Sequence, residues 1–180
     1  MSTHTKHKTD AELLSDKIKD VRVAMMTTTE PDGTLHSRPM VTQDISAVKF
    51  DGDLWFLTFA SAPKVKDVEG HRQVNLSYSK PDKNLFITIS GSARLVDDRK
   101  KVKDLWNPIA KAWFQTEPED PNVRLLKVHV ESAEFWEGPS GKAGGLFAAA
   151  RRRASHSESS GGSDVKLDLH SLSSSRTKKS

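Results

Sequence analysis

The sequence contains no cysteine. Without cysteine the chain forms no disulfide, offers no thiolate to a metal and has no thiol nucleophile. This absence is typical of proteins of a reducing compartment, and we expect a cytoplasmic protein. Long apolar runs are also missing, and the polar start MSTHTKHKTD has no hydrophobic segment of the kind found in signal peptides. The sequence therefore predicts neither a signal peptide nor a membrane span.

Most of the chain also lacks an excess of either charge. From Arg151 onward there are seven basic and three acidic side chains, which account for the whole net charge of +4. The first 150 residues carry 21 side chains of each sign. Nucleic-acid-binding domains usually have a basic face, so a neutral body predicts no nucleic-acid partner. The high isoelectric point of about 9.3 is a property of the C-terminal tail.

Metal-binding and nucleotide-binding patterns are not recognisable either. The seven histidines include no pair at helical spacing with a nearby carboxylate, so we expect no metal site. The segment GPSGKAGG is glycine-rich like a phosphate loop. Its Lys142 is followed by Ala143 instead of serine or threonine, which argues against a nucleoside triphosphatase.

Short β-type segments separated by turn residues dominate the remaining sequence. Two Asp-Gly pairs predict hairpin turns, and Gly91 inside a long strand predicts a bulge or a close backbone approach. Asp10 and Ser61 are expected helix N-caps, and Pro108 is expected to interrupt a helical segment. The expected strands cover 21–29, 35–43, 48–50, 54–59, 73–79, 85–96 and 123–138. The expected helices cover 10–21, 61–72, 97–114 and 142–154.

This order predicts one mainly β domain, a small barrel with accessory helices. The first helix is expected to plug one end of the barrel. We divide the chain into a flexible leader (1–9), the barrel domain (10–153) and a Ser-rich basic tail (154–180). The tail is expected to be disordered because it has little apolar surface to bury. Its removal from Ser155 onward is then expected to leave the melting temperature nearly unchanged.

One group of residues has the chemistry of an anion site. Arg38 lies in a strand directly before Pro39, and Lys64 lies in the first turn of a predicted helix. Thr58 and Ser61 add hydroxyls nearby. Hydroxyls, a lysine, an arginine fork and free helix N–H groups are what a phosphate monoester requires. An arginine on a solvent face or in an ion pair, and a solvated lysine, are the alternative interpretations.

The order of the motifs resembles the FMN-binding split-barrel family related to pyridoxamine 5'-phosphate oxidase, in particular its general stress protein branch. The similar segments are HSRPM, DGDLWFLTFASAPKVKDVEGHRQVNLSYS, FITISGSARLVDDRKKVKDLW and AEFWEGPSGK. The resemblance covers about residues 10 to 150. It implies a six-stranded antiparallel split barrel that forms a homodimer with a flavin at each interface, and no membrane partner.

The resemblance also implies which residues bind the flavin. Lys64 and Ser61 match the phosphate contacts, and Trp136 matches an aromatic residue that reaches the ring from the partner subunit. Met40 and Trp136 would form an apolar wall for the isoalloxazine. FMN is the expected cofactor, with FAD and deazaflavin F420 as alternatives. The cofactor-binding residues implied are Ser37, Arg38, Pro39, Met40, Leu57, Thr58, Ser61, Lys64 and Trp136.

Two departures from the oxidases that make pyridoxal phosphate bear on the activity. Those enzymes hold the substrate phosphate with an arginine-rich segment after the tryptophan, whereas here EGPSGKAGGLF contains one lysine and no arginine. Gln43 stands where their flavin strand ends in lysine. The sequence therefore indicates an FMN-dependent oxidoreductase of unknown substrate and argues against true pyridoxamine 5'-phosphate oxidase activity. A flavin carrier or redox sensor without turnover is the alternative, and no catalytic side chain is assigned.

Overall fold

The computed structural model describes residues 9–19, 21–43, 50–138 and 163–168. No helix within these ranges is long and apolar enough to cross a membrane. The helices are α1 (Asp10–Ile18), α2 (Pro63–Gly70), α3 (Arg99–Leu105) and α4 (Pro108–Phe114), with a single 3-10 turn, η1 (Pro81–Lys83). The strands are β1 (Val23–Thr29), β2 (Leu35–Val41), β3 (Asp53–Phe59), β4 (Gln73–Lys80), β5 (Leu85–Val96), β6 (Val123–Glu137) and β7 (Ser163–Asp168).

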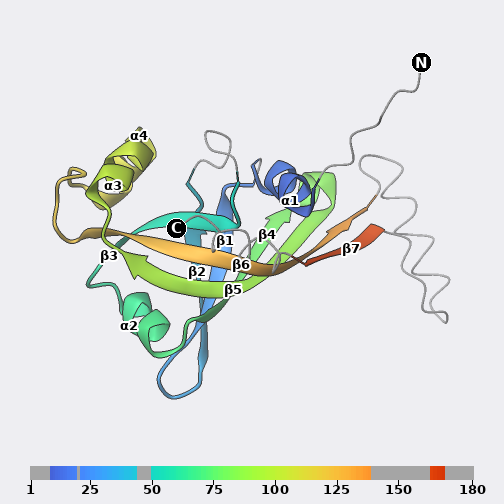
Figure 1. Ribbon diagram of the computed structural model, residues 1–180, viewed down its shortest axis with the longest axis horizontal. Helices are drawn as coiled ribbons and strands as arrows, with labels where there is room; N and C mark the ends of the chain where they lie inside the picture. Colours follow the sequence, from blue (N-terminus) through green and yellow to red (C-terminus); the bar gives the residue numbers. More distant parts are fainter. Residues whose placement is uncertain (1–8, 20, 44–49, 139–162, 169–180) are drawn as a thin grey trace, which may run out of the picture.

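Seven strands form one antiparallel sheet in the order β2-β1-β4-β5-β6-β3, and β7 also pairs with β6 (Figure 1). Strand β3 pairs with residues 123–129 of β6, and β7 pairs with residues 132–137, so both use the same edge of β6. An isolated antiparallel bridge between Thr42 and Phe56 joins the two ends of this order. The sheet therefore closes on itself, which confirms the predicted split barrel, with seven strands in place of the expected six.

The interior of the barrel follows from strict alternation along the strands. In β4, buried Val74, Leu76 and Tyr78 alternate with residues that reach solvent. Leu14 and Ile18 of α1 are fully buried in the same core, which agrees with the plug expected of this helix. The Tyr78 hydroxyl is hydrogen-bonded to the Thr42 hydroxyl at 2.8 Å. Burial raises the pKa of Tyr78, so this pair stays neutral inside the core.

A second, smaller core lies on the outer side of β3 and β6, beneath α3 and α4. Leu57 and Leu125 pack there against Val102 of α3. The rings of Phe59 and Phe114 meet edge to face at 4.9 Å. The break expected at Pro108 is confirmed, since α3 ends at Leu105 and α4 begins at Pro108. Two helices therefore cover one part of the barrel wall.

Gly91 marks an irregularity in the longest contact of the sheet. The β5–β6 register shifts between Ser90 and Gly91, as the bulge prediction expected. A Cβ atom at Gly91 would lie 2.3 Å from the carbonyl oxygen of His129, so only glycine fits there without a backbone shift. The shift bends the two strands and helps the sheet to curl.

Three local expectations differ from the structure. The N-cap of α1 is Thr9 instead of Asp10, because Thr9 and Glu12 form a reciprocal capping box. The N-cap of α2 is Ala62 and not Ser61, and it makes no side-chain bond. No hairpin around Asp51–Gly52 is found in the described residues, since Phe50 is not in a strand and β3 pairs with β6. Residues 48–49 of that hairpin lie outside the described residues, and so does the predicted helix 142–154.

The C-terminal tail contains a strand, which differs from the disorder expected over 154–180. Residues 163–168 pair with β6, and Leu167 is only 3% exposed within the main core. One apolar side chain at a position that faces the core is enough to add a strand, because β6 already presents unpaired backbone groups there. Residues 163–168 therefore have paired and buried contacts that their removal would break, and the expectation of unchanged stability without this region stays a prediction.

Replacement of Leu167 by alanine is expected to lower the free energy of unfolding by about 2–4 kcal/mol, because it removes a buried side chain that holds β7 to the core. The measurement is urea unfolding followed by tryptophan fluorescence. Lys166→Ala on the exposed face of the same strand is the control and should change stability by less than about 0.5 kcal/mol. Equal effects of the two variants would show that β7 does not contribute through Leu167.

Candidate functional site

Helix α2 positions the residues at the centre of the candidate site. Val65 and Val68 are buried, and they fix the helix against β1 and β5. Pro63 begins the helix, and its cap Ala62 offers no side-chain acceptor. The N–H groups of the first turn and the positive end of the helix dipole are therefore not occupied by a capping side chain.

Arg38 of β2 reaches this helix and forms a closed triangle with two other side chains. Its Nη1 donates to the Thr28 hydroxyl at 2.7 Å, and its Nη2 donates to Oδ2 of Asp67 at 3.2 Å. The Thr28 hydroxyl in turn donates to the same Oδ2 at 2.9 Å. The side chains of Arg38 and Asp67 are 16% and 8% exposed. Arg38 therefore forms an ion pair with a buried carboxylate of its own chain. An ion pair was one of the two alternatives to ligand binding that the sequence allowed for this arginine.

Lys64 lies beside this triangle, one turn before Asp67 on α2. The pKa of Lys64 is lowered, first by burial and then by repulsion from Arg38. In the part of the chain that the structure describes, no carboxylate forms an ion pair with Lys64, whereas Asp67 pairs with Arg38. Two cations and one carboxylate leave one uncompensated positive charge, which favours an anionic ligand at the start of α2.

The two hydroxyl residues near Lys64 have different surroundings. Thr58 is buried, and its hydroxyl donates to the carbonyl of Phe59 at 3.3 Å. The Ser61 hydroxyl accepts from Nδ2 of Asn122 at 3.2 Å, and its N–H donates to Oδ1 of the same residue. Asn122 thus holds the loop between β3 and α2. Ser61 remains exposed directly before the helix, where its hydroxyl can still donate to a ligand.

The other predicted residues of β2 and β3 divide between the two faces of the sheet. Ser37 and Pro39 point outward and are exposed. Met40 is buried in the main core, and Leu57 is buried in the core beneath α3 and α4. The expectation that Met40 forms an apolar wall for a ligand is therefore wrong for its side chain, and a ligand along β2 meets its backbone instead.

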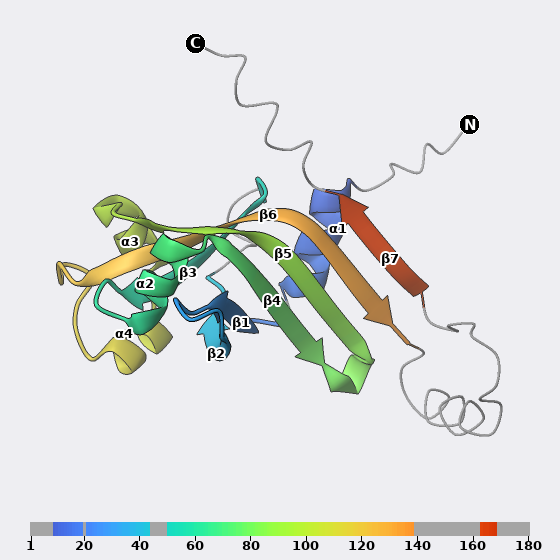
Figure 2. The same ribbon diagram turned by 90° about the horizontal axis from the view of Figure 1, so that it is seen from below.

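The structure does not bring Trp136 to this group within one chain. Thr58 pairs with Arg124 near the start of β6, whereas Trp136 lies twelve residues further along, about 40 Å at the usual strand rise. Figures 1 and 2 both show α2, α3 and α4 at one end of the molecule, and α1 and β7 at the other. A ligand in contact with both Lys64 and Trp136 would need two copies of the chain.

One broad surface of the barrel carries no charged side chain. We call it the uncharged face, and it consists of the outward residues of β2, β1 and β4 and of the part of β5 from Phe86 to Ser90; exposed Arg94, further along β5, lies outside it. Thr27 and Ser37 share a hydrogen bond of 2.7 Å on it, and Asn75 donates to Thr88 at 2.8 Å. Phe86 extends the face to its cross-strand neighbour Trp136. Its members are Leu35, Ser37, Pro39, Val41, Val23, Met25, Thr27, Thr29, Gln73, Asn75, Ser77, Ser79, Phe86, Thr88 and Ser90.

This composition is unusual for a surface that meets water. In the whole chain 29% of residues are charged, yet none of the positions just named is charged, and the nearest charge on the outward side of β5 is Arg94 beyond its bulge. Several of the apolar members are well exposed, with Val23 at 51% and Phe86 at 47%. Interfaces are depleted of charge at their centre and enriched in aromatic residues and methionine. The uncharged face therefore has the composition of a surface that another molecule covers.

A separate polar cluster lies at the start of β3. The buried carboxylate of Asp53 accepts from Lys127 and, at 2.9 Å, interacts with Nδ1 of His129. Both partners belong to β6, directly opposite or two residues from Asp53 in the register. The acid is already compensated by these groups, so this cluster links β3 to β6 and leaves no free charge for a ligand.

Thr28 and Asp67 were not identified from the sequence as site residues. Asp67 could have been suspected, because it lies between the apolar positions Val65 and Val68 of α2, where an acid is costly to bury without a partner. Thr28 carries no such signal. Its importance depends on β1 lying next to β2, with Thr28 two positions from the direct partner of Arg38.

Comparison with known proteins supports the resemblance of the motifs. Residues 9–159 match the family described as pyridoxamine 5'-phosphate oxidase like. The protein bli-3 of Neurospora crassa is 31% identical over 139 residues, which cover 68% of this chain and 65% of that protein. The chain thus spans less than two thirds of the length of this relative.

Solved structures share the fold. The general stress FMN/FAD binding protein of Xanthomonas citri is 31% identical, with a TM-score of 0.62, over 73% of this chain and 90% of that one. The general stress protein 26 of a Jannaschia species has a TM-score of 0.64 at 24% identity, over 86% of this chain and 95% of that one, which is a likeness of fold alone. With its split barrel, the order of its motifs and the match over residues 9–159, the chain belongs to the pyridoxamine 5'-phosphate oxidase-like family.

Proposed function

We propose that this protein is an FMN-dependent oxidoreductase in which two copies of the chain form two flavin sites at their interface. The observation that carries the proposal is Lys64, a partly buried cation beside Arg38 with no acidic partner in the described part of the chain. The related protein of Xanthomonas citri is named as an FMN/FAD binding protein. FMN has the terminal phosphate that such a cation selects, and FAD and deazaflavin F420 are the alternatives.

The residues present fit a flavin phosphate. Lys64 supplies a positive charge, Ser61 supplies a hydroxyl, and the start of α2 supplies N–H groups without a side-chain cap. Burial makes the uncompensated charge of Lys64 unfavourable in the empty protein, and a phosphate would relieve this cost. Along β2, Ser37 and Pro39 offer a neutral surface to the rest of the cofactor.

A second copy supplies what one chain lacks. Trp136 is the residue expected to approach the flavin ring, and it lies in the half of β6 that pairs with β7, away from the half that pairs with β3. The uncharged face connects β2 with Phe86 and Trp136, so two copies that meet on it would bring the tryptophan of one to the flavin strand of the other. Exposed Val23, Met25 and Val41 would lose their contact with water in such a dimer.

A bound flavin supplies hydride or electron transfer by itself, so the protein needs no acid or base of its own for that chemistry. The chain binds and orients the cofactor and excludes water from it. Gln43, which stands where the flavin strand of the oxidases that make pyridoxal phosphate ends in lysine, is buried, and its side-chain oxygen accepts from Nδ2 of Asn107 at 3.1 Å. This neutral amide pair offers no positive charge to a substrate phosphate, which supports a substrate other than pyridoxamine 5'-phosphate.

The direct test is the visible absorption spectrum of the purified protein before and after incubation with FMN and gel filtration. Two flavin bands that stay with the protein are expected. Their bleaching by a nicotinamide nucleotide and recovery with an electron acceptor would support the oxidoreductase. Retained flavin that no nicotinamide nucleotide bleaches would favour a carrier or sensor. A colourless protein that does not retain FMN would contradict both functions.

Replacement of Lys64 by methionine is expected to weaken FMN binding by about 1–3 kcal/mol, the size of a lost charged hydrogen bond, and to leave riboflavin binding unchanged. Fluorescence titration with both flavins measures this. The lowered pKa of Lys64 means that the folded state disfavours the charged amine. The flavin-free variant should therefore be at least as stable as the wild type. Equal weakening for both flavins would remove Lys64 from the phosphate site.

Replacement of Met25 by lysine places a charge in the middle of the uncharged face. Two copies that meet there would bury this lysine without a partner, so the dissociation constant of the dimer should rise by more than about a hundredfold. Analytical ultracentrifugation measures this constant. Ala112→Lys, which adds the same charge at an exposed position of α4, is the control. A Met25 variant that remains a dimer would show that the chain associates through another surface.

A further inference from the structure

Asp67 is an acid placed where the proposed ligand is an anion. Its carboxylate lies on α2, one helical turn after Lys64, and it is buried with 8% of the side chain exposed. A phosphate site is expected to concentrate positive charge, and a carboxylate next to it weakens the attraction of the site for anions. The position of Asp67 therefore calls for an explanation beyond the binding of phosphate.

The contacts of Asp67 determine which edge of Arg38 a ligand can reach. The two terminal nitrogens of the guanidinium are the ones that could hold a phosphate bidentately. One of them donates to Asp67 at 3.2 Å and the other to Thr28 at 2.7 Å. Thr28 also donates to Asp67 at 2.9 Å, so both terminal nitrogens of Arg38 bond to groups that are themselves joined. The forked end of Arg38 is thus directed at its own chain.

The balance of charges, like the hydrogen bonds, leaves Lys64 and not Arg38 as the cation available to an anion. With Asp67 ionised, the pair Arg38–Asp67 is neutral, and Lys64 is left as the uncompensated cation among the described residues of this site. Without the carboxylate, the site would carry two positive charges within reach of one anion. A phosphate monoester at neutral pH carries close to two negative charges, and it would bind more strongly to the second arrangement.

We propose that Asp67 determines the specificity of the flavin site by holding Arg38 away from the ligand, so that the phosphate meets Lys64 as its principal cation. This inference rests on the proposed flavin function. It predicts a site that prefers flavins with a terminal phosphate less strongly than a site in which both Lys64 and Arg38 reach the phosphate. Selectivity for the phosphate would then be limited by the chain itself, through an acid that no ligand touches.

A purely structural role for Asp67 leads to a different expectation. If the acid served only to attach α2 to β1 and β2, its removal would loosen the site and weaken every flavin by the same factor. Melting temperature alone does not separate the two roles, because loss of a buried ion-pair partner lowers it in both. The ratio of the affinities for FMN and riboflavin does separate them, since the two ligands differ only in the phosphate.

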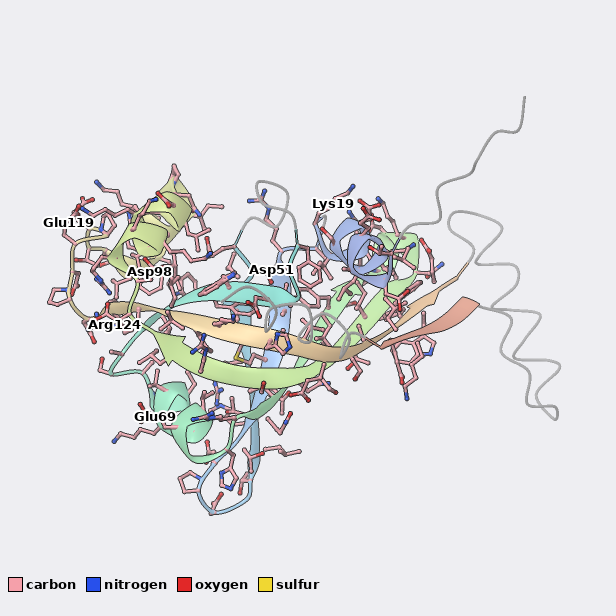
Figure 3. The ribbon with its side chains drawn as sticks, in the orientation of Figure 1. Lys19, Asp51, Glu69, Asp98, Glu119 and Arg124 are labelled. Atoms are coloured by element: carbon pink, nitrogen blue, oxygen red, sulfur yellow. The ribbon has the colours of Figure 1, made fainter. Side chains whose placement is uncertain are left out.

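The experiment compares FMN and riboflavin titrations of the full chain for the wild type, Asp67→Asn and Glu69→Gln. Asparagine keeps the size of Asp67 and can still accept from Thr28, but it releases the charge that holds Arg38. Glu69 is an exposed acid on the same helix (Figure 3), so its variant removes the same charge without touching Arg38. Asp67→Ala is the second variant in case the asparagine variant does not fold.

We expect Asp67→Asn to increase the FMN-to-riboflavin affinity ratio by roughly tenfold, the gain of one charge-assisted contact, while Glu69→Gln changes it by less than about twofold. A ratio that stays the same or falls in both Asp67 variants would overturn the inference and leave the flavin function standing. Failure of the wild type to bind either flavin would overturn the proposed function, and this inference with it.

Discussion

The architecture depends on one strand, β6, whose single free edge serves two others. Its fifteen residues are long enough for β3 to pair with the first half and β7 with the second. Its alternate side chains also join the two cores, since Val128 faces the barrel interior and Leu125 faces α3 and α4. Gly91 allows the neighbouring strand to come close to β6 and bend with it. Most of the barrel wall is therefore organised around this strand.

The length of β6 also separates the parts of the candidate site. Helix α2, which carries Lys64, lies at one end of the molecule, and β7, which pairs with the part of β6 that contains Trp136, lies at the other (Figures 1 and 2). In the proposed flavin site, the separation of α2 from the end of β6 is the reason for which a second copy of the chain is invoked. The uncharged face supplies a physical route by which a second copy could complete the site, because it extends from β2 to Phe86 next to Trp136.

Charge compensation explains the most specific contacts at the site. A buried guanidinium without a partner is strongly destabilising, and Asp67 with Thr28 removes that cost for Arg38. No carboxylate of the described residues does the same for Lys64, whose pKa is lowered by burial and by repulsion from Arg38. A stable ion pair and an unsatisfied cation thus lie side by side, one serving the fold and the other open to a ligand.

The sequence by itself determined the elements of the barrel and its class. Alternation along 73–79 and 85–96, the bulge at Gly91 and the break at Pro108 are local signals, and the structure has all of them. The motifs around Arg38 and Lys64 were also enough to identify the family, because their order and spacing are properties of the chain.

Only the tertiary structure decided what these residues contact. Asp67 is distant from Arg38 in sequence, and their pairing depends on how α2 packs against the sheet. The apolar side chain of Met40 would suit the surface of a flavin ring, but it points to the side of β2 that faces the core. The Ser-rich tail is too polar to predict an ordered segment, yet Leu167 is buried in the core and its strand pairs with the edge of β6. In each case the deciding contact joins segments far apart in the chain, and local patterns carry no information about such contacts.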